Sequence, residues 1–326
     1  CKYYKMIKKL LTYTFIILSC FMFAQQTVQF TQFTFNKYGY NPAAAGTNIN
    51  SGIEVIVGGR QQWIGFDNAP TTNFLSANYT IKPQRSYRRW HNVGIYMGRE
   101  KVGLFRNENY YLSYTLHLPL SKRLNMSFGI FAGVRNMAFD RKRISIDDPV
   151  YAATHANYFL IYPNFIPGIR LYNKKSFLDI SIHQIYKNRQ VQGDKQVGTK
   201  SVLVQQMYVS LGRKFILENN VILIPAINVH SSFIGIPSIE GNVMAYFKKR
   251  VGVGVTLRNK DFISGIFQIR FLKNLTAGFS YDYSINKMRA AAPHTVEFML
   301  GLTPMMTNMM DDKGKRSVAK CPDFDF

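Results

Sequence analysis

Asn109 to Leu118 reads NYYLSYTLHL, and its residues alternate between two classes. Every second position is apolar or aromatic, and the positions between are on the whole more polar: Tyr110, Leu112, Tyr114, Leu116 and Leu118 against Asn109, Tyr111, Ser113, Thr115 and His117. Successive side chains of an extended strand point to opposite faces. The segment therefore predicts a β-strand with one oily face and one more polar face.

The same two-residue alternation recurs along most of the chain. It marks about fourteen candidate strands, at residues 53–66, 72–82, 91–101, 107–118, 123–138, 160–172, 175–187, 203–217, 221–233, 238–249, 251–259, 261–272, 273–284 and 294–303. Outer-membrane barrels use an even number of antiparallel strands of about ten residues. A closed sheet also pairs every backbone N–H and C=O, which the membrane interior requires. We therefore expect an all-β transmembrane antiparallel β-barrel of about 14 strands.

Alternation alone also fits a soluble β-sandwich or propeller. Composition favours lipid surroundings, because hydrophobic residues make up 47% of the chain and charged residues only 18%. The candidate polar faces carry Gly, Ser, Thr and charged residues, which suit a barrel interior better than a protein core. Aromatic residues near strand ends suggest a girdle at the membrane interface, namely Trp63, Phe66, Trp90, Tyr110, Tyr172, Tyr281 and Tyr283.

The first 24 residues have the layout of a signal peptide. Lys8 and Lys9 follow Met6, an apolar run from Leu10 to Phe23 comes next, and cleavage is expected after Ala24. Residues 1–5 are interpreted as an upstream extension. The apolar run is shorter than the roughly 20 residues that a membrane-spanning helix needs. A lipoprotein is the alternative, because residues 17–20 loosely resemble a lipobox ending in Cys20.

The rest of the chain divides into three parts. We expect a periplasmic or lumenal N-terminal segment at 25–50, the outer-membrane barrel at 51–303 and a periplasmic tail at 304–326. Short turns at 173–174, 218–220 and 259–261 are expected on the periplasmic side, and the longer gaps at 141–158, 190–201 and 286–293 on the extracellular side. If Cys1 and Cys20 are removed by processing, Cys321 is the one cysteine left, so no intramolecular disulfide is expected.

The chain is strongly basic, with a formal net charge of +23. Such a charge attracts anionic partners, and nucleic acid is the first soluble candidate. An exported protein instead meets outer-membrane lipid, lipopolysaccharide phosphates and acidic polypeptides, so no nucleic-acid partner is expected. The alternative is that the basic residues are ordinary loop and rim residues at the membrane surface.

Three blocks near the N-terminus carry a family resemblance. Residues 29–37 read QFTQFTFNK, residues 41–46 read NPAAAG and residues 59–63 read GRQQW. In order and spacing they resemble the opening of the PorP/SprF family, outer-membrane proteins of the type IX secretion and gliding-motility apparatus. The chain departs from the family pattern at Ala44, where an aromatic residue is usual, and at residues 293–297, which match the family's last-strand motif only loosely.

The resemblance implies a fourteen-stranded barrel that works with other secretion-system outer-membrane and periplasmic proteins, or with a cognate secreted adhesin. Its implied role is non-enzymatic, and no cofactor is implied. Residues 25–50 carry aromatics without barrel alternation, so we expect them to pack into the lumen or across the periplasmic mouth; an ordinary lead-in to the first strand is the alternative. The candidate motif, partner or plug residues are Gln29, Phe30, Gln32, Phe33, Phe35, Asn36, Asn41, Pro42, Gly46, Arg60 and Trp63.

Charged and histidine residues on the polar strand faces are candidates for the barrel interior, namely Glu54, Arg135, Asp179, His183, Lys214, Glu240, Arg258, Arg270, Asp282 and Glu297. They would either tie the walls together or line an ion or solute path. His117, His183 and His230 share the polar face, but lone histidines there are more often hydrogen-bonded wall residues than catalytic ones. No catalytic triad, metal-ligand spacing or phosphate loop stands out. An outer-membrane porin or solute channel is the alternative function, and a soluble β-rich binding module is a third.

Overall fold

The computed structural model describes most of the predicted barrel and the segment before it. The described residues are 29–47, 52–81, 89–121, 123–139, 159–186, 191–192, 195–196, 204–217, 221–233, 236–248, 250–259, 261–272, 274–291 and 294–302. The expected signal peptide, the tail at 304–326, Cys321 and the long gap at 141–158 lie outside these ranges.

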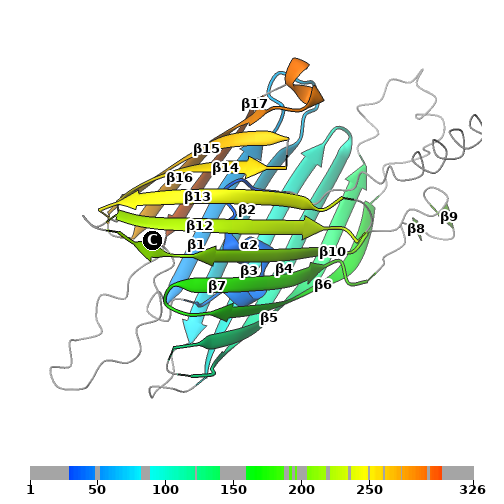
Figure 1. Ribbon diagram of the computed structural model, residues 1–326. Coiled ribbons are helices and arrows are strands. Elements are labelled where there is room, and N and C mark those ends of the chain that lie inside the picture. The colour runs from blue at the N-terminus through cyan, green and yellow to red at the C-terminus, as the bar shows by residue number, and fades with distance from the viewer. Residues whose placement is uncertain are drawn as a thin grey trace, which may run out of the picture.

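The chain forms a closed antiparallel barrel of fourteen strands (Figure 1). Each strand pairs with its neighbours in sequence, β1 closes on β17, and β10 and β11 are two parts of one strand. The strands are β1 Ile53–Gln61, β2 Thr71–Ile81, β3 Trp90–Val102, β4 Phe105–Pro119, β5 Asn125–Phe139, β6 Phe159–Tyr172, β7 Ser176–His183, β10 Gln206–Arg213, β11 Phe215–Ile216, β12 Val221–Ser231, β13 Ser238–Phe247, β14 Val251–Arg258, β15 Phe262–Phe271, β16 Leu275–Ser284 and β17 His294–Leu302.

Five short elements complete the described structure. The strands β8 Val191–Gln192 and β9 Lys195–Gln196 pair with each other outside the barrel sheet. The 3-10 helix η5 Lys287–Ala290 lies in the connection between β16 and β17. The helix α2 Lys37–Tyr40 and the 3-10 helix η2 Pro42–Ala44 precede the first strand. Within the described ranges, no helix is long and apolar enough to span a membrane.

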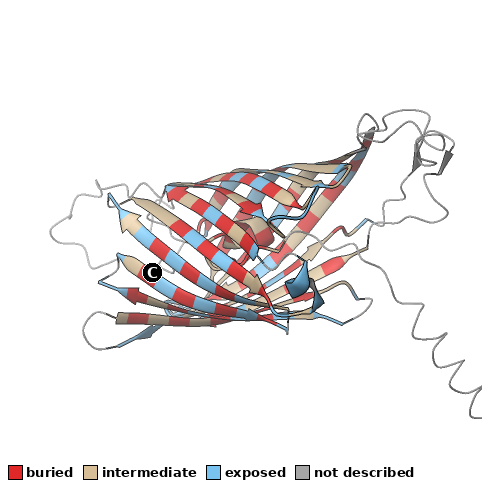
Figure 2. Ribbon diagram, turned by 90° about the horizontal axis from the view of Figure 1, so that it is seen from above, coloured by how far each residue is buried: buried red, intermediate tan, exposed pale blue. Residues whose placement is uncertain are grey.

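The two faces of the wall differ as the alternation predicts. In β14, Val253, Val255 and Leu257 are exposed on the outside, whereas Gly252, Gly254 and Thr256 face the lumen and are buried. Figure 2 shows the same alternation of buried and exposed residues along strand after strand. An apolar outer surface is stable only against lipid, so the wall is built to stand in a membrane.

Two expectations from the sequence are wrong: the extent of the first strand and the place of two aromatic residues. The first strand ends at Gln61 rather than at residue 66, because Trp63 adopts a positive φ of 49° that ends the extended conformation. Trp90 and Tyr172 do not belong to an outer girdle. They face the lumen and are 4% and 1% exposed, because the Trp90 indole donates to the Gly46 carbonyl and the Tyr172 hydroxyl shares a hydrogen bond with His117. Tyr110 and Tyr281 do lie on the outer face.

The two ends of the barrel differ in their connections. One end, here the terminal end, is where β1 begins and β17 finishes, and its turns are short, as at 173–175 and 248–250. The other, here the loop end, carries the long connections 140–158 and 184–205. The turn at 259–261 joins β14 to β15 at the loop end, so its expected grouping with the tight turns at 173–174 and 218–220 is wrong.

A charge placed on the outer face should destabilise the barrel according to its depth. Val255 lies in the middle of β14, and Phe215, which pairs with Leu223 on the outward face, lies close to the terminal end of the barrel. We expect Val255→Lys to lower the free energy of unfolding in lipid vesicles by about 2–4 kcal/mol and Phe215→Lys by about 0–1 kcal/mol. Denaturant titrations measure both values. Equal costs for the two substitutions would contradict a lipid-facing wall.

Candidate functional site

Residues Gln29–Thr47, here called the plug, lie inside the barrel (Figure 1, where α2 is seen through the strands). Gln29 reaches the loop end, where the Ser238 hydroxyl at the start of β13 donates to Gln29 Oε1 over 3.3 Å. Gly46 reaches the terminal end, where the Trp90 indole N–H at the start of β3 donates to its carbonyl over 3.0 Å. The plug therefore runs through the lumen from one end to the other.

Two asparagines shape the middle of the plug. Asn36 caps α2, and its side chain accepts a hydrogen bond from Gly39 N over 3.2 Å. Asn41 caps η2, and its Oδ1 accepts from Ala43 N over 2.9 Å, while Pro42 occupies the first helical position, where no N–H is needed. Asn41 therefore ends α2 and begins η2, so the Asn41-Pro42 pair joins the two short helices of the plug.

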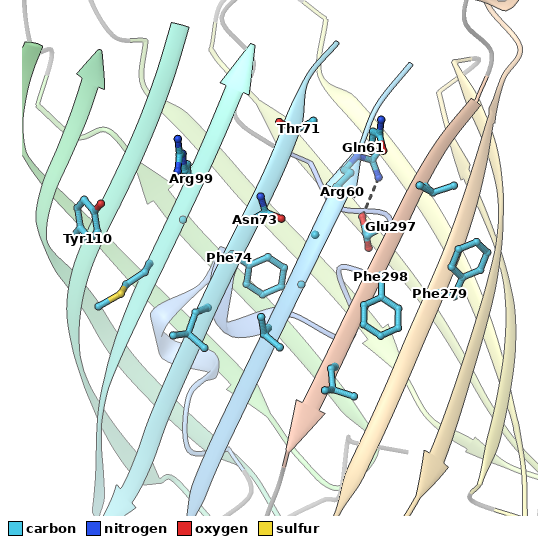
Figure 3. Close-up of a pocket in the computed structure, with 18 residues that line it drawn as sticks. Arg60, Gln61, Thr71, Asn73, Phe74, Arg99, Tyr110, Phe279, Glu297 and Phe298 are labelled. Atoms are coloured by element: carbon cyan, nitrogen blue, oxygen red, sulfur yellow. Dashed lines mark hydrogen bonds and ion pairs between the residues drawn. The ribbon is translucent and has the colours of Figure 1, made fainter. Parts of the chain in front are cut away.

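A buried ion cluster of Arg60, Asp282 and Glu297 stands on the wall beside the plug. Arg60 Nη2 lies 2.8 Å from Asp282 Oδ2, and Nη1 lies 3.0 Å from Glu297 Oε2. The three residues come from the adjacent strands β1, β16 and β17 and are all at most 2% exposed. Figure 3 shows the contact between Arg60 and Glu297. One guanidinium thus faces two carboxylates, which leaves one negative charge to be stabilised by other groups.

The plug supplies those groups. The backbone N–H groups of Thr31 and Gln32 donate to the two oxygens of Glu297 over 2.9 and 3.0 Å. The Thr31 hydroxyl donates to Asp282 Oδ2 over 2.8 Å and accepts from Arg60 Nη1 over 2.9 Å. Buried charges are costly unless they are paired and hydrogen-bonded. The ion cluster is therefore complete only with the plug in place.

On the other side of the lumen the wall donates and the plug accepts. Ser181 Oγ donates to the Tyr40 carbonyl over 2.7 Å, Thr115 Oγ1 to the Pro42 carbonyl over 2.8 Å and Ser127 Oγ to the Ala43 carbonyl over 2.7 Å. His183 and His117 bind the carbonyls of Tyr40 and Ala45 through Nε2, each over 2.8 Å. These strands, β4, β5 and β7, therefore satisfy the backbone of a buried segment that has little regular structure of its own.

A second buried ion pair meets the plug at Asn41. Arg170 Nη1 lies 3.1 Å from Asp179 Oδ2, and Asn41 Nδ2 donates to Asp179 Oδ1 over 3.3 Å and to the Ile169 carbonyl over 3.0 Å. The sequence predicted Asp179 as a lumenal charge but did not single out Arg170. Arg170 lies on the polar face of β6, in phase with Gly168, and this position is the signal that could have identified it.

Glycines in the wall make room for the plug. A Cβ atom on Gly129 would stand 2.3 Å from Ala43 N, and one on Gly168 would stand 1.9 Å from Asn41 Oδ1. Both approaches are too short for any side chain, so the plug contacts the bare backbone of β5 and β6.

Aromatic rings fill the space between these polar contacts. The centroid of the Phe30 ring lies 4.9 Å from that of Phe74, Tyr38 lies 5.0 Å from Phe131, and Tyr40 lies 5.3 Å from Tyr208. The Tyr38 hydroxyl shares a hydrogen bond of 2.6 Å with Ser113, and burial raises the pKa of the Tyr38 phenol well above its usual value. The phenol therefore keeps its proton and its role as a hydrogen-bonding group.

Most of the predicted site residues meet in this assembly. Phe33 and Gln32 are buried, Gln268 Nε2 donates to Gln32 Oε1 over 3.3 Å, and Phe35 packs over Gly301. Arg258 pairs with Glu240 over 3.1 Å, and Asn78 donates to Glu54 over 3.0 Å. Arg135 and His183 line a small cavity of about 80 Å³ against Tyr40, and Arg270 shares the lumenal face of β15 with Gln268. Trp63 lies apart from the plug, in the connection after β1, where its backbone N–H donates to Thr295 Oγ1 over 3.2 Å.

A metal site is not formed by the part of the chain that the structure describes, since no group of three or more His, Cys, Asp or Glu residues there could hold an ion.

Removing the cation of the ion cluster should cost more than removing an outer one. Arg60→Ala leaves Asp282 and Glu297 buried without their partner, and we expect the free energy of unfolding to fall by about 3–5 kcal/mol. Arg213, an exposed residue at the end of β10, is the control, and Arg213→Ala should leave stability unchanged within error. Denaturant titration of both variants in the same vesicles decides; equal effects would contradict the role given to the ion cluster.

Comparisons with solved structures return outer-membrane barrels. The Ralstonia pickettii toluene transporter TbuX is 9% identical over 82% of this chain and 92% of its own, with a TM-score of 0.49. The CymD monoaromatic hydrocarbon channel is 12% identical over 81% and 94%, with a TM-score of 0.47. A Pseudomonas aeruginosa FadL homologue is 10% identical over 83% and 93%, with a TM-score of 0.46. Likenesses at this level carry no argument about function.

Sequence comparison identifies the family. No curated protein matches the chain. A family model described as type IX secretion system membrane protein PorP/SprF matches residues 22–302, which include the plug and every strand of the barrel. The chain therefore belongs to the PorP/SprF family of type IX secretion system membrane proteins of the outer membrane.

Proposed function

We propose that this protein is a plugged, non-enzymatic barrel of the type IX secretion and gliding machinery that supports the export or surface attachment of a partner protein. The observation that carries the proposal is the plug, which is bonded to β1, β16 and β17 on one side of the lumen and to β4, β5, β6 and β7 on the other. Its partners would be other outer-membrane and periplasmic secretion components and one cognate secreted protein.

The partners of the lumenal polar groups support a plugged secretion component over an open porin. A porin keeps a water-filled lumen whose polar groups line the solute path, whereas other barrels are closed by an inserted segment. Here Arg60, Asp282 and Glu297 bind one another and the plug, and Ser127 and Thr115 bind its carbonyls. The described cavity above the plug, about 80 Å³, is small beside the roughly 300–1,000 Å³ of usual ligand pockets.

The same contacts argue against a catalytic use of the lumenal histidines. His117 and His183 each bind a plug carbonyl through Nε2, and His117 Nδ1 shares a hydrogen bond of 2.8 Å with the Tyr172 hydroxyl. Both histidine side chains therefore have structural partners inside the barrel. A general base needs a reacting proton within hydrogen-bond reach, and these rings are already engaged.

Export is tested by deleting the gene and following a tagged type IX substrate. We expect the substrate to be lost from the cell surface and medium in the deletion strain and restored by the wild-type gene. A gene carrying Arg213→Ala, whose side chain is remote from the plug, should restore it fully. Intact secretion and gliding in the deletion strain would refute the proposed role.

The plug is tested separately by single-channel recording in planar bilayers. The wild-type protein should show little open current. Gly129→Leu and Gly168→Leu place side chains where the plug now lies, and we expect large, stable conductance steps from the double variant. The control is Gly241→Leu, because a Cβ atom at Gly241 meets nothing within 4 Å. Wild-type conductance as large as that of the double variant would favour the porin alternative.

A further inference from the structure

A groove of about 930 Å³ lies on the outer wall of the barrel, across β3, β2, β1, β17 and β16 (Figure 3). Much of its lining is apolar, since Val57, Leu75, Met97, Phe298 and Leu300 line it from the outward faces of these strands. These five side chains point away from the interior, because successive residues of a strand alternate in direction, whereas the lumen-facing residues Phe74, Arg60 and Glu297 also border the groove.

The groove exists because one outward position in β1 has no side chain. Gly59 pairs with Asn73 on β2 and with Phe298 on β17. Both neighbours project outward from the wall, whereas Gly59 leaves a trough between them. A Cβ atom on Gly59 would stand 3.0 Å from Asn73 Oδ1, so a larger side chain there would fill the trough.

The part of the groove toward the loop end is polar and continues into a row of polar and charged residues. The strand register aligns Asn73, Arg99, Glu108 and Asn136 across β2 to β5 on the outward face. Lys101 lies two residues after Arg99, and the register places Arg106 beside Lys101. We call Arg99, Lys101 and Arg106 the cationic patch.

Among the residues that the structure describes, one carboxylate forms ion pairs with the cationic patch, which has three basic side chains. Glu108 Oε1 lies 3.6 Å from Arg99 Nε and 3.3 Å from Arg106 Nε, so one carboxylate is shared by two guanidinium groups. The side chains of Arg99 and Arg106 remain 56% and 42% exposed. Guanidinium groups in this state offer further N–H donors to an anion, and phosphate is the anion that their fork geometry fits best.

We propose that the groove and the cationic patch together bind a lipopolysaccharide molecule, with acyl chains along the apolar part and a lipid A phosphate on Arg99 and Arg106. Three observations select this occupant. The site joins an oily trough to a cationic end, as an anionic lipid requires. It stands on the lipid-facing side of an outer-membrane wall. The cationic patch lies at the loop end, which in outer-membrane barrels faces the leaflet that holds lipopolysaccharide.

The phosphate contacts are tested with full-length protein that has been stripped of lipid and titrated with lipid A in detergent, followed by native mass spectrometry. We expect the wild type to bind one lipid A and to bind phosphatidylethanolamine and phosphatidylglycerol at least tenfold more weakly. Arg99→Gln with Arg106→Gln should weaken lipid A binding at least tenfold, since charge-assisted hydrogen bonds are lost. Glu108→Gln, which removes the shared carboxylate, should strengthen it severalfold.

The trough is tested with a matched pair of glycine variants. Gly59→Leu should weaken lipid A binding at least tenfold, whereas Gly265→Leu, at an outward glycine of β15 where a Cβ atom meets nothing within 4 Å, should not change it. Heat-dependent gel migration verifies folding, and the exposed arginine variants decide the matter if Gly59→Leu does not fold. Unchanged binding in the arginine variants, equal binding of phosphatidylglycerol, or equal effects of the two glycine variants would overturn the proposal.

Discussion

Two carboxylates and one guanidinium, buried side by side in the wall of a membrane protein, need a further source of hydrogen bonds. Asp282 and Glu297 exceed the charge of Arg60, and the strands around them offer no spare backbone donors because a closed sheet uses its own. The N–H groups of Thr31 and Gln32 meet this need. The constraint ties the first described residues of the chain to its last strand, and with them it fixes the plug inside the barrel.

In the rest of the lumen the roles are exchanged: the plug carries the acceptors and the wall supplies the donors. A plug with little regular structure carries carbonyl groups that must also be satisfied when they are buried. The wall therefore presents Ser, Thr, His and Trp donors opposite the plug, and glycines where its backbone comes closest. The plug and its contacts thus fill this part of the lumen, which leaves the outer surface and the two ends of the barrel as the surfaces open to other molecules.

Much of the wall could be predicted from the sequence. The alternation in segments such as 109–118 located the strands and identified the lumenal face, because a membrane barrel enforces that pattern at nearly every position. It misplaced Trp90 and Tyr172, since an aromatic residue near a strand end can serve either the interface or the interior. The pairing of Thr31 with Glu297, 266 positions apart, could not be predicted, because hydrogen bonds between distant residues leave no periodic signal in one sequence.

The central claim is that the plug occupies the lumen of the folded protein in the membrane. Photo-crosslinking tests it most directly, with a benzophenone amino acid in place of Tyr38, whose ring lies against Phe131 of β5 and whose hydroxyl meets Ser113 of β4. Mass spectrometry of irradiated cells should find the label joined to peptides of β4 or β5 of the same molecule. Labels joined to other proteins or to lipid, with none to these strands, would contradict the account.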